Sequence, residues 1–179
     1  FGWKPEWGTP GDLRDDLNFT TEVLIPILIP QMTNQANKGL WEFVRLVNRI
    51  PVASFYTVNG LGPVMYMSFA GRVELENRAG GAIAQNVGRT YTLTDQEKGY
   101  LVGLGVDVNS LLQQMNSATE FTSDHNARNY VEHYFDPSGR IKVPILTLHT
   151  IGDPLAIPNN ESAYRETVEE QGNADLLMQ

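Results

Sequence analysis

Apolar and polar positions follow a helical period along much of the chain before residue 136. The clearest case is the segment 38–50, whose polar side is formed by residues such as Glu42 and Arg45. Its apolar residues recur at spacings of three and four: Leu40, Phe43, Val44, Val47 and Ile50. This pattern predicts an amphipathic helix that ends before Pro51.

The segments on either side of this helix are less regular. Residues 1–18 are rich in Gly, Pro and charge and predict a loop, and residues 19–30 predict a short buried helix or an irregular stretch broken by prolines. Residues 52–71 are apolar and aromatic around a turn at 60–63. A second helical pattern follows through Val73, Leu75 and Ile83, with a Gly80–Gly81 interruption. No strand-like alternation is convincing before residue 136.

Capping residues divide the next stretch into three short helices. Thr94 and Glu97 have the spacing of a capping box, and Gly103 and Gly105 are suited to end the helix that follows. The second helix can be capped by the first pair of residues given next, and the third helix by the second pair. The candidates are Asp107 or Asn109, and Ser123 or Asp124.

The pattern changes after the turn sequence at residues 136–139. Residues 143–150 form a short apolar run with the composition of a strand, and a Gly-Asp-Pro loop follows at 152–154. A helix is then expected to begin at Asn159 or Asn160 and to close at Gly172, with a strand beginning at residues 176–177. This order of strand, loop, helix and strand is typical of a parallel α/β sheet.

Composition narrows the classes of partner and site. The net charge of −8 argues against nucleic acid and against anionic membranes as partners. The chain has no cysteine, so disulfides and thiolate sites are excluded. His125 and His133 would lie about 12 Å apart along one helix, too far to share an ion, so no metal and no cofactor is expected. The acidic pairs at 15–16 and 74–76 are expected to be solvated surface charge.

The segment from Arg140 to Pro154 resembles the late acid strand of α/β-hydrolases. In that family a basic residue and a Val-Pro pair lead into an apolar strand, and a loop of the form His-x-x-x-Asp-Pro follows. The resemblance implies an α/β fold in two parts. Residues 1–138 would form a mainly helical cap or lid, and residues 139–179 would form an incomplete strand–loop–helix piece of the parallel hydrolase sheet.

The resemblance gives Asp153 the place of the catalytic carboxylate. There it would orient a histidine that acts as general base for a serine. The alternative is that Asp153 only caps the turn before Pro154. The chain contains no Gly-x-Ser-x-Gly motif, since the nearest serine, Ser68, has a tyrosine where the first glycine belongs. No histidine follows His149, although the family places its histidine after the acid.

Two functions therefore stay open. The first is a fragment or subunit of a serine α/β-hydrolase that acts on an ester or related acyl bond and is inactive alone. Its partner would be the missing part of its own hydrolase domain or a self-associated copy, and its substrate a small acyl compound. Residues 55–69 would then line a lid wall, or else form the core of the lid itself. The second is a non-enzymatic helical module that binds a partner protein or an apolar ligand.

Overall fold

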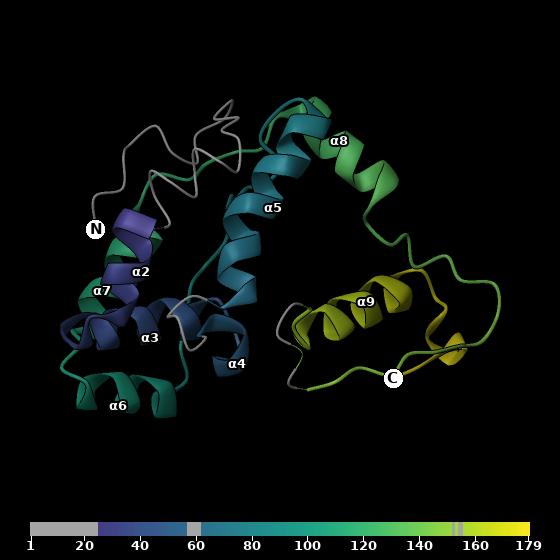
Figure 1. Cartoon of the computed structure of the whole chain (residues 1–179). Coiled ribbons are helices and arrows are strands. Elements are labelled where there is room, and N and C mark those ends of the chain that lie inside the picture. The colour runs from purple at the N-terminus through teal and green to yellow at the C-terminus, as the bar shows by residue number, and fades with distance from the viewer. Residues whose placement is uncertain (1–24, 57–61, 152, 154–155) are drawn as a thin grey trace.

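The computed structural model describes residues 25–56, 62–151, 153 and 156–179, and it is mainly helical (Figure 1). The expected loop at 1–18 and the acidic pair at 15–16 lie outside these residues, as does the first half of the stretch 19–30. The helices before residue 136 are α2 Ile29–Thr33, η2 Gln35–Asn37, α3 Lys38–Val47, α4 Val52–Phe55, α5 Pro63–Ala79, α6 Asp95–Gly103, α7 Val108–Ser117 and α8 His125–Tyr134. The later elements are β1 Ile145–Leu146, α9 Asn159–Glu170, η3 Ala174–Leu176 and β2 Leu177–Met178.

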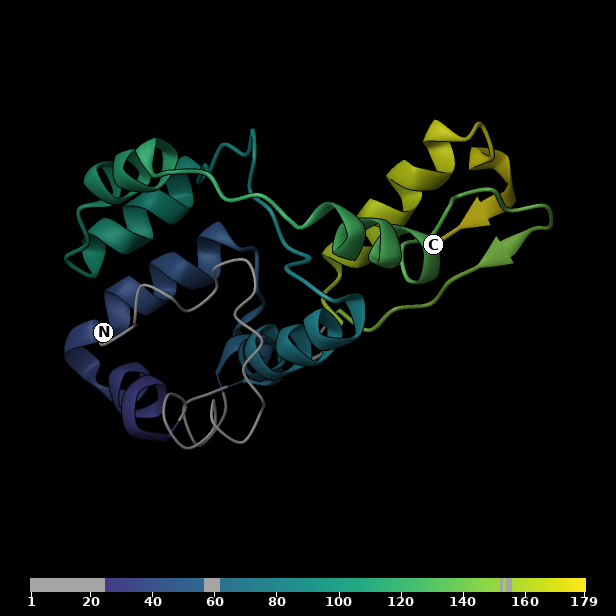
Figure 2. The ribbon, with the colours of Figure 1, turned by 90° about the horizontal axis from the view of Figure 1, so that it is seen from above.

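The helices form a row of packed groups along the molecule. Helices α2, α3, α6 and α7 gather at one end, and α5 and α8 pack side by side in the middle (Figures 1 and 2). Helix α9 and the two strands lie at the other end, after the extended connection that leaves α8. A helical chain followed by a short parallel strand pair is therefore the observed architecture.

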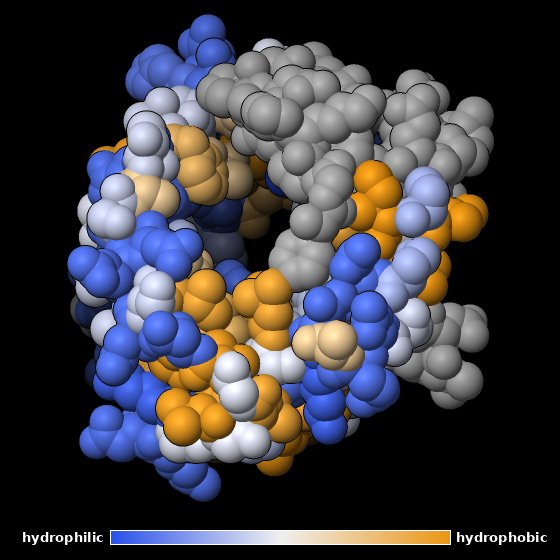
Figure 3. Space-filling view, turned by 90° about the vertical axis from the view of Figure 1, so that its left-hand side faces the viewer, coloured by the Kyte–Doolittle hydropathy of each residue, from blue (hydrophilic) through white to orange (hydrophobic). Residues whose placement is uncertain are grey.

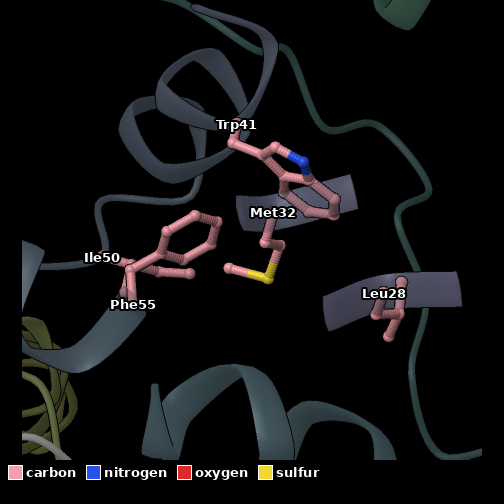
Figure 4. Close-up of a cluster of buried hydrophobic side chains, with 5 residues drawn as sticks. All are labelled: Leu28, Met32, Trp41, Ile50 and Phe55. Atoms are coloured by element: carbon pink, nitrogen blue, oxygen red, sulfur yellow. The ribbon is translucent and has the colours of Figure 1, made fainter. Parts of the chain in front are cut away.

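Helix α3 lies at the centre of the first group because it contributes to two apolar clusters. The first cluster consists of Leu28, Met32, Trp41, Ile50 and Phe55. In Figure 4 the Met32 side chain points toward Phe55 and Ile50 below the Trp41 indole. The second cluster consists of Phe43, Val47, Leu93, Leu101 and Val108. The helix predicted over 38–50 is present over Lys38–Val47, three residues shorter than predicted, and two of its sides are buried. Phe55 is buried in the first cluster, so this aromatic belongs to the core of the helical part.

Two carboxylates expected at the surface are buried, which corrects the sequence analysis. Glu42 is 5% exposed, because α3 is covered on both sides and its polar stripe faces protein. Glu76 is 2% exposed and forms an ion pair with Arg72 one helical turn away. Its carboxylate also accepts a hydrogen bond from the backbone N–H of Ile83 at 3.3 Å. Glu74 is exposed as expected and pairs with Arg78 at 2.7 Å.

At each predicted helix start the structure identifies one capping residue. Thr94 and Glu97 form the full capping box at the start of α6. Asp107 caps α7 through the Ser110 N–H, and Asp124 caps α8 by accepting from two backbone N–H groups. The aspartate is therefore the cap in both cases, and the other candidates, Asn109 and Ser123, are not.

A close backbone approach joins α3 to the connection between α6 and α7. A Cβ atom at Gly39 would lie 2.6 Å from Val106 Cγ2, so the absence of a side chain at Gly39 allows the two segments to touch.

Figure 3 shows the side of the molecule where α6 and α7 lie, with apolar residues gathered in its lower half. Among the described residues no helix is long and apolar enough to cross a membrane.

Candidate functional site

The candidate site is built on the parallel pairing of β1 with β2. Ile145 lies opposite Leu177 and Leu146 opposite Met178, and Thr147 continues the ladder by donating its N–H to the Met178 carbonyl at 2.9 Å. Helix α9 connects the two strands. The predicted strand over 143–150 is thus present, but only two of its residues are paired as a strand within the part of the chain that the structure describes.

Asp153 lies in the loop between the carboxyl end of β1 and the start of α9, and its side chain is half-buried. Its backbone N–H donates to the Thr150 carbonyl at 3.0 Å. Its Oδ1 accepts from the Ala156 N–H at 2.9 Å. Asp153 therefore caps this loop, as the turn interpretation predicts. The bond from Ala156 also restrains the carboxylate, and orienting an imidazole requires such a restraint.

A polar cluster that the sequence analysis missed ties both strands to the first turn of α9. Glu161 Oε2 accepts from Thr147 Oγ1 at 2.6 Å and from Gln179 Nε2 at 2.8 Å. Gln179 Nε2 also donates to the backbone carbonyl of Glu161 at 2.8 Å. An acidic residue in the first turn of a helix is favoured by the helix dipole. The position of Glu161 at the start of the predicted helix was the only sign of this cluster in the sequence. The cluster fixes the start of α9 relative to β1. It therefore sets the two ends of the loop that carries Asp153.

The turn at the other end of α9 is held by a glycine. Gly139 has a φ of 68°, and a Cβ there would lie 2.3 Å from the Thr167 carbonyl oxygen. The Gly139 carbonyl accepts from Asn173 Nδ2 at 3.0 Å, and Arg140 Nε donates to Gln171 Oε1 at 3.2 Å. The connection from α8 is thus fastened to the last turn of α9.

One face of the small sheet is open. In β1, Ile145 is half-buried and Leu146 is 61% exposed. In the residues that follow the strand, Thr147 is half-buried and Leu148 is 88% exposed. Met178, opposite Leu146 in the register, is 68% exposed and lies on the same face. Apolar residues exposed together in this way form the kind of surface on which another element can pack. We call Leu146, Leu148 and Met178 the open face of the sheet.

The other residues considered from the sequence do not join this site. Ser68 lies inside α5, so the strained strand-to-helix turn of a hydrolase nucleophile is absent around it. His149 Nδ1 lies 2.9 Å from the Thr150 carbonyl oxygen, the contact expected of a structurally held histidine. His125 and His133 lie at opposite ends of α8, and the described residues contain no group of three metal-ligating side chains.

Comparison with known proteins gives no relative: no protein family model, curated protein or solved structure matches the chain.

Proposed function

We propose that this chain supplies the carboxylate-bearing segment, and a helical lid, of a serine α/β-hydrolase that cleaves an ester or related acyl bond. The observation that carries the proposal is the position of Asp153. It follows the carboxyl end of β1, precedes α9, and belongs to a unit whose second strand runs parallel to the first. Open α/β sheets bind and transform their ligands at this edge.

The role of Asp153 follows from the chemistry of a charge-supported histidine. A carboxylate that accepts from an imidazole N–H fixes the ring in one tautomer and stabilises the imidazolium that forms when a serine gives up its proton. The carboxylate must be rigid for this, and the bond from Ala156 N–H to Asp153 Oδ1 restrains it. The serine and the histidine would come from polypeptide outside these 179 residues.

The open face of the sheet supports a partner of this kind. Parallel sheets are normally covered on both faces, and a two-stranded sheet is marginal by itself. Helix α9 contacts the residue after β1 through the bond between Glu161 and Thr147, whereas Leu146, Leu148 and Met178 remain exposed. The remaining strands and helices of a hydrolase domain would cover them. A second copy of the chain is the other occupant that the open face would accept.

The test uses the complete translation product that contains these residues. Labelling with a fluorophosphonate would report an activated serine, and hydrolysis of p-nitrophenyl butyrate would report turnover. Asp153→Asn is expected to lower kcat by a factor on the order of 10⁴, the loss seen when the triad aspartate of a serine protease is changed to asparagine. Asp175→Asn, at an exposed aspartate of η3, is the matched control and should leave kcat unchanged.

Two results would overturn the proposal. One is a complete translated protein that neither reacts with the fluorophosphonate nor hydrolyses the ester. The other is turnover that Asp153→Asn lowers no more than Asp175→Asn does. Either result would leave the helical binding module as the better description of the chain.

A further inference from the structure

An open groove lies between the chain that leaves α8 and one face of α9. In Figures 1 and 2 the carboxyl end of α8 lies above α9. The groove has a volume of about 600 Å³, within the range of pockets that bind small organic ligands. Its positions on α9 are three and four residues apart, so they share one face of the helix over about two turns. The described residues that line the groove are Asp136, Pro137, Asn160, Ala163, Tyr164 and Thr167.

The turn around Gly139 holds the two walls of the groove together. A Cβ at Gly139 would lie 2.3 Å from the Thr167 carbonyl oxygen, so the two backbones approach closely there. The Gly139 carbonyl also accepts from Asn173 Nδ2 at 3.0 Å. The wall that carries Asp136 is therefore fixed against α9, and the groove keeps its width without a ligand.

Several polar groups in the groove are suited to accept hydrogen bonds. Asp136 Oδ2 accepts from Arg128 Nη2 at 2.6 Å, and an ionised carboxylate has further acceptor positions and no donor. Thr167 Oγ1 donates to the Ala163 carbonyl at 2.9 Å, so only its lone pairs are left for a ligand. The amide and the phenol on the same helix face can both donate and accept. A ligand that displaces water from these groups must bring several donors, because an acceptor buried without one is unfavourable.

The charges around the groove favour a neutral ligand. Arg128 pairs with Glu132 at 2.8 Å and with Asp136 at 2.6 Å, so one cation is shared by two carboxylates. The described lining contains neither lysine nor arginine. An anion would therefore meet negative charge, and a cation would compete with Arg128 for Asp136. A neutral compound with several hydroxyl groups meets neither cost.

An exposed aromatic surface lies where α8 ends. Tyr134 is 67% exposed, and Phe135 beside it is exposed as well. The Tyr134 ring contacts the rings of Tyr130 and His133 at centroid distances of 4.9 and 4.5 Å. These contacts hold the Tyr134 ring in place. The face of an aromatic ring is apolar and carries partial negative charge, so it attracts C–H groups such as those on one face of a sugar ring.

We propose that this groove binds a neutral sugar, whose hydroxyl groups donate to Asp136 and Thr167 and whose ring packs on Tyr134. The two requirements are independent, since the groove asks for several hydroxyl donors and the end of α8 offers an aromatic face. The proposal does not rest on the hydrolase function, because Asp153 takes no part in it. Asp153→Asn should therefore leave sugar binding unchanged.

A proline-rich peptide is the other ligand that packs on exposed aromatic rings. Proline has no backbone N–H, so such a peptide brings few hydrogen-bond donors. It would cover the Asp136 carboxylate without satisfying it. The groove therefore favours the sugar, and the peptide becomes an outcome of the test.

The experiment titrates the whole chain with glucose, galactose, mannose, maltose and cellobiose, following amide chemical shifts by NMR. We expect at least one sugar to give saturable shifts at residues 134–137 and 160–167. Cyclohexanol has a six-membered ring with a single hydroxyl, and the uronic acid of the binding sugar adds a negative charge. Each should bind at least about fivefold more weakly, the factor that one lost hydrogen bond accounts for. A proline decamer should give no shifts at these residues.

Two pairs of variants assign the contacts. Tyr134→Ala should weaken sugar binding by about fivefold or more, whereas Phe121→Ala, at an exposed ring near the other end of α8, should not. Asp136→Ala should weaken it by a similar factor. Glu132→Ala removes the other carboxylate that pairs with Arg128, but Glu132 is outside the described lining, so binding should be unchanged.

The melting temperature of each variant shows whether a loss of binding comes from unfolding. The proposal is wrong if no sugar shifts the groove residues, or if cyclohexanol, the uronic acid or the proline decamer binds as tightly as the sugar. It is also wrong if Tyr134→Ala and Asp136→Ala both keep full affinity.

Discussion

Replacing Gly139 by alanine tests whether the turn after α8 is fixed on α9 as the structure has it. Gly139 has a φ of 68°, a conformation that costs a residue with a Cβ about 1–2 kcal/mol. The new Cβ would also lie 2.3 Å from the carbonyl oxygen and 2.7 Å from the carbonyl carbon of Thr167. These are backbone atoms, so the turn must move, and forced repacking of this kind costs about a further 1–3 kcal/mol.

Gly172→Ala provides a matched control for this prediction. Gly172 ends the same helix with a φ of 72°, but a Cβ there would meet no atom within 4 Å. The Gly172→Ala variant therefore has only the energetic cost of placing a Cβ at a positive φ. Urea unfolding followed by circular dichroism should therefore give Gly139→Ala a larger loss of unfolding free energy than Gly172→Ala, by about 1–3 kcal/mol. Hydrogen exchange should place that loss in α9 and β2.

Equal losses in the two variants would refute this reasoning. They would mean that Gly139 does not approach the Thr167 carbonyl closely in solution. The bond from Asn173 Nδ2 to the Gly139 carbonyl would then be absent as well, and the last turn of α9 would be free of the connection from α8.

Three further predictions concern the helical part. Tyr56→Phe removes a buried hydroxyl that lies next to the Glu42 carboxylate, and it should change the unfolding free energy at neutral pH by no more than about 1 kcal/mol. Because burial raises the folded pKa of Tyr56, stability should fall as pH rises above about 10, and spectroscopic pH titration should show a smaller fall in the variant. For Glu97, burial raises the pKa, but bonds from Thr94 and Arg49 outweigh it and lower the pKa. Its contribution should be lost as pH falls below about 4.3, so acid unfolding of Glu97→Gln should show a shallower pH dependence. Asp124→Ala should cost about 1 kcal/mol in thermal unfolding, and Ser123→Ala much less, because Asp124 alone caps α8.

Local signals in the sequence predicted the local features of the fold. The capping box of α6 depends on two residues three positions apart, and the helical stripe of α3 on a spacing of three and four, so both can be read without knowing the neighbours. The order of β1, loop, α9 and β2 was predicted in the same way. The choice of Asp107 over Asn109 was not, because both residues suit the position and the start of the helix decides between them.

Burial of polar residues could not be predicted, because it depends on neighbours from distant parts of the chain. Glu42 lies on the polar stripe of α3, yet that stripe faces Tyr56 and a cavity that includes η2 and α2 residues. The Thr147–Glu161–Gln179 cluster joins residues up to 32 positions apart, and no short motif marks it. Asp153 was proposed as a site residue because the resemblance placed it there, and its bond to Ala156 is a restraint that the sequence alone does not show.

The two parts of the chain differ in how complete their cores are, and this bears on the proposed partner. The helical part buries two clusters of apolar side chains. After residue 139, by contrast, Val168 is the one buried large hydrophobic among the described residues. The large hydrophobics exposed in this part are Val143, Leu146, Leu148, Ile151 and Met178.

A region with so little buried apolar surface is expected to open at low free energy. A partner that covers the open face of the sheet binds only the folded form of this region, so it must stabilise the region by mass action, by about 2.7 kcal/mol at a concentration of one hundred times its Kd. Amide exchange in β1, α9 and β2 should therefore slow when the partner is present and stay unchanged in the helices before residue 118. Under the proposed function the same ordering would further restrain the Asp153 loop, so slower amide exchange at residues 150–156 is expected together with that in α9.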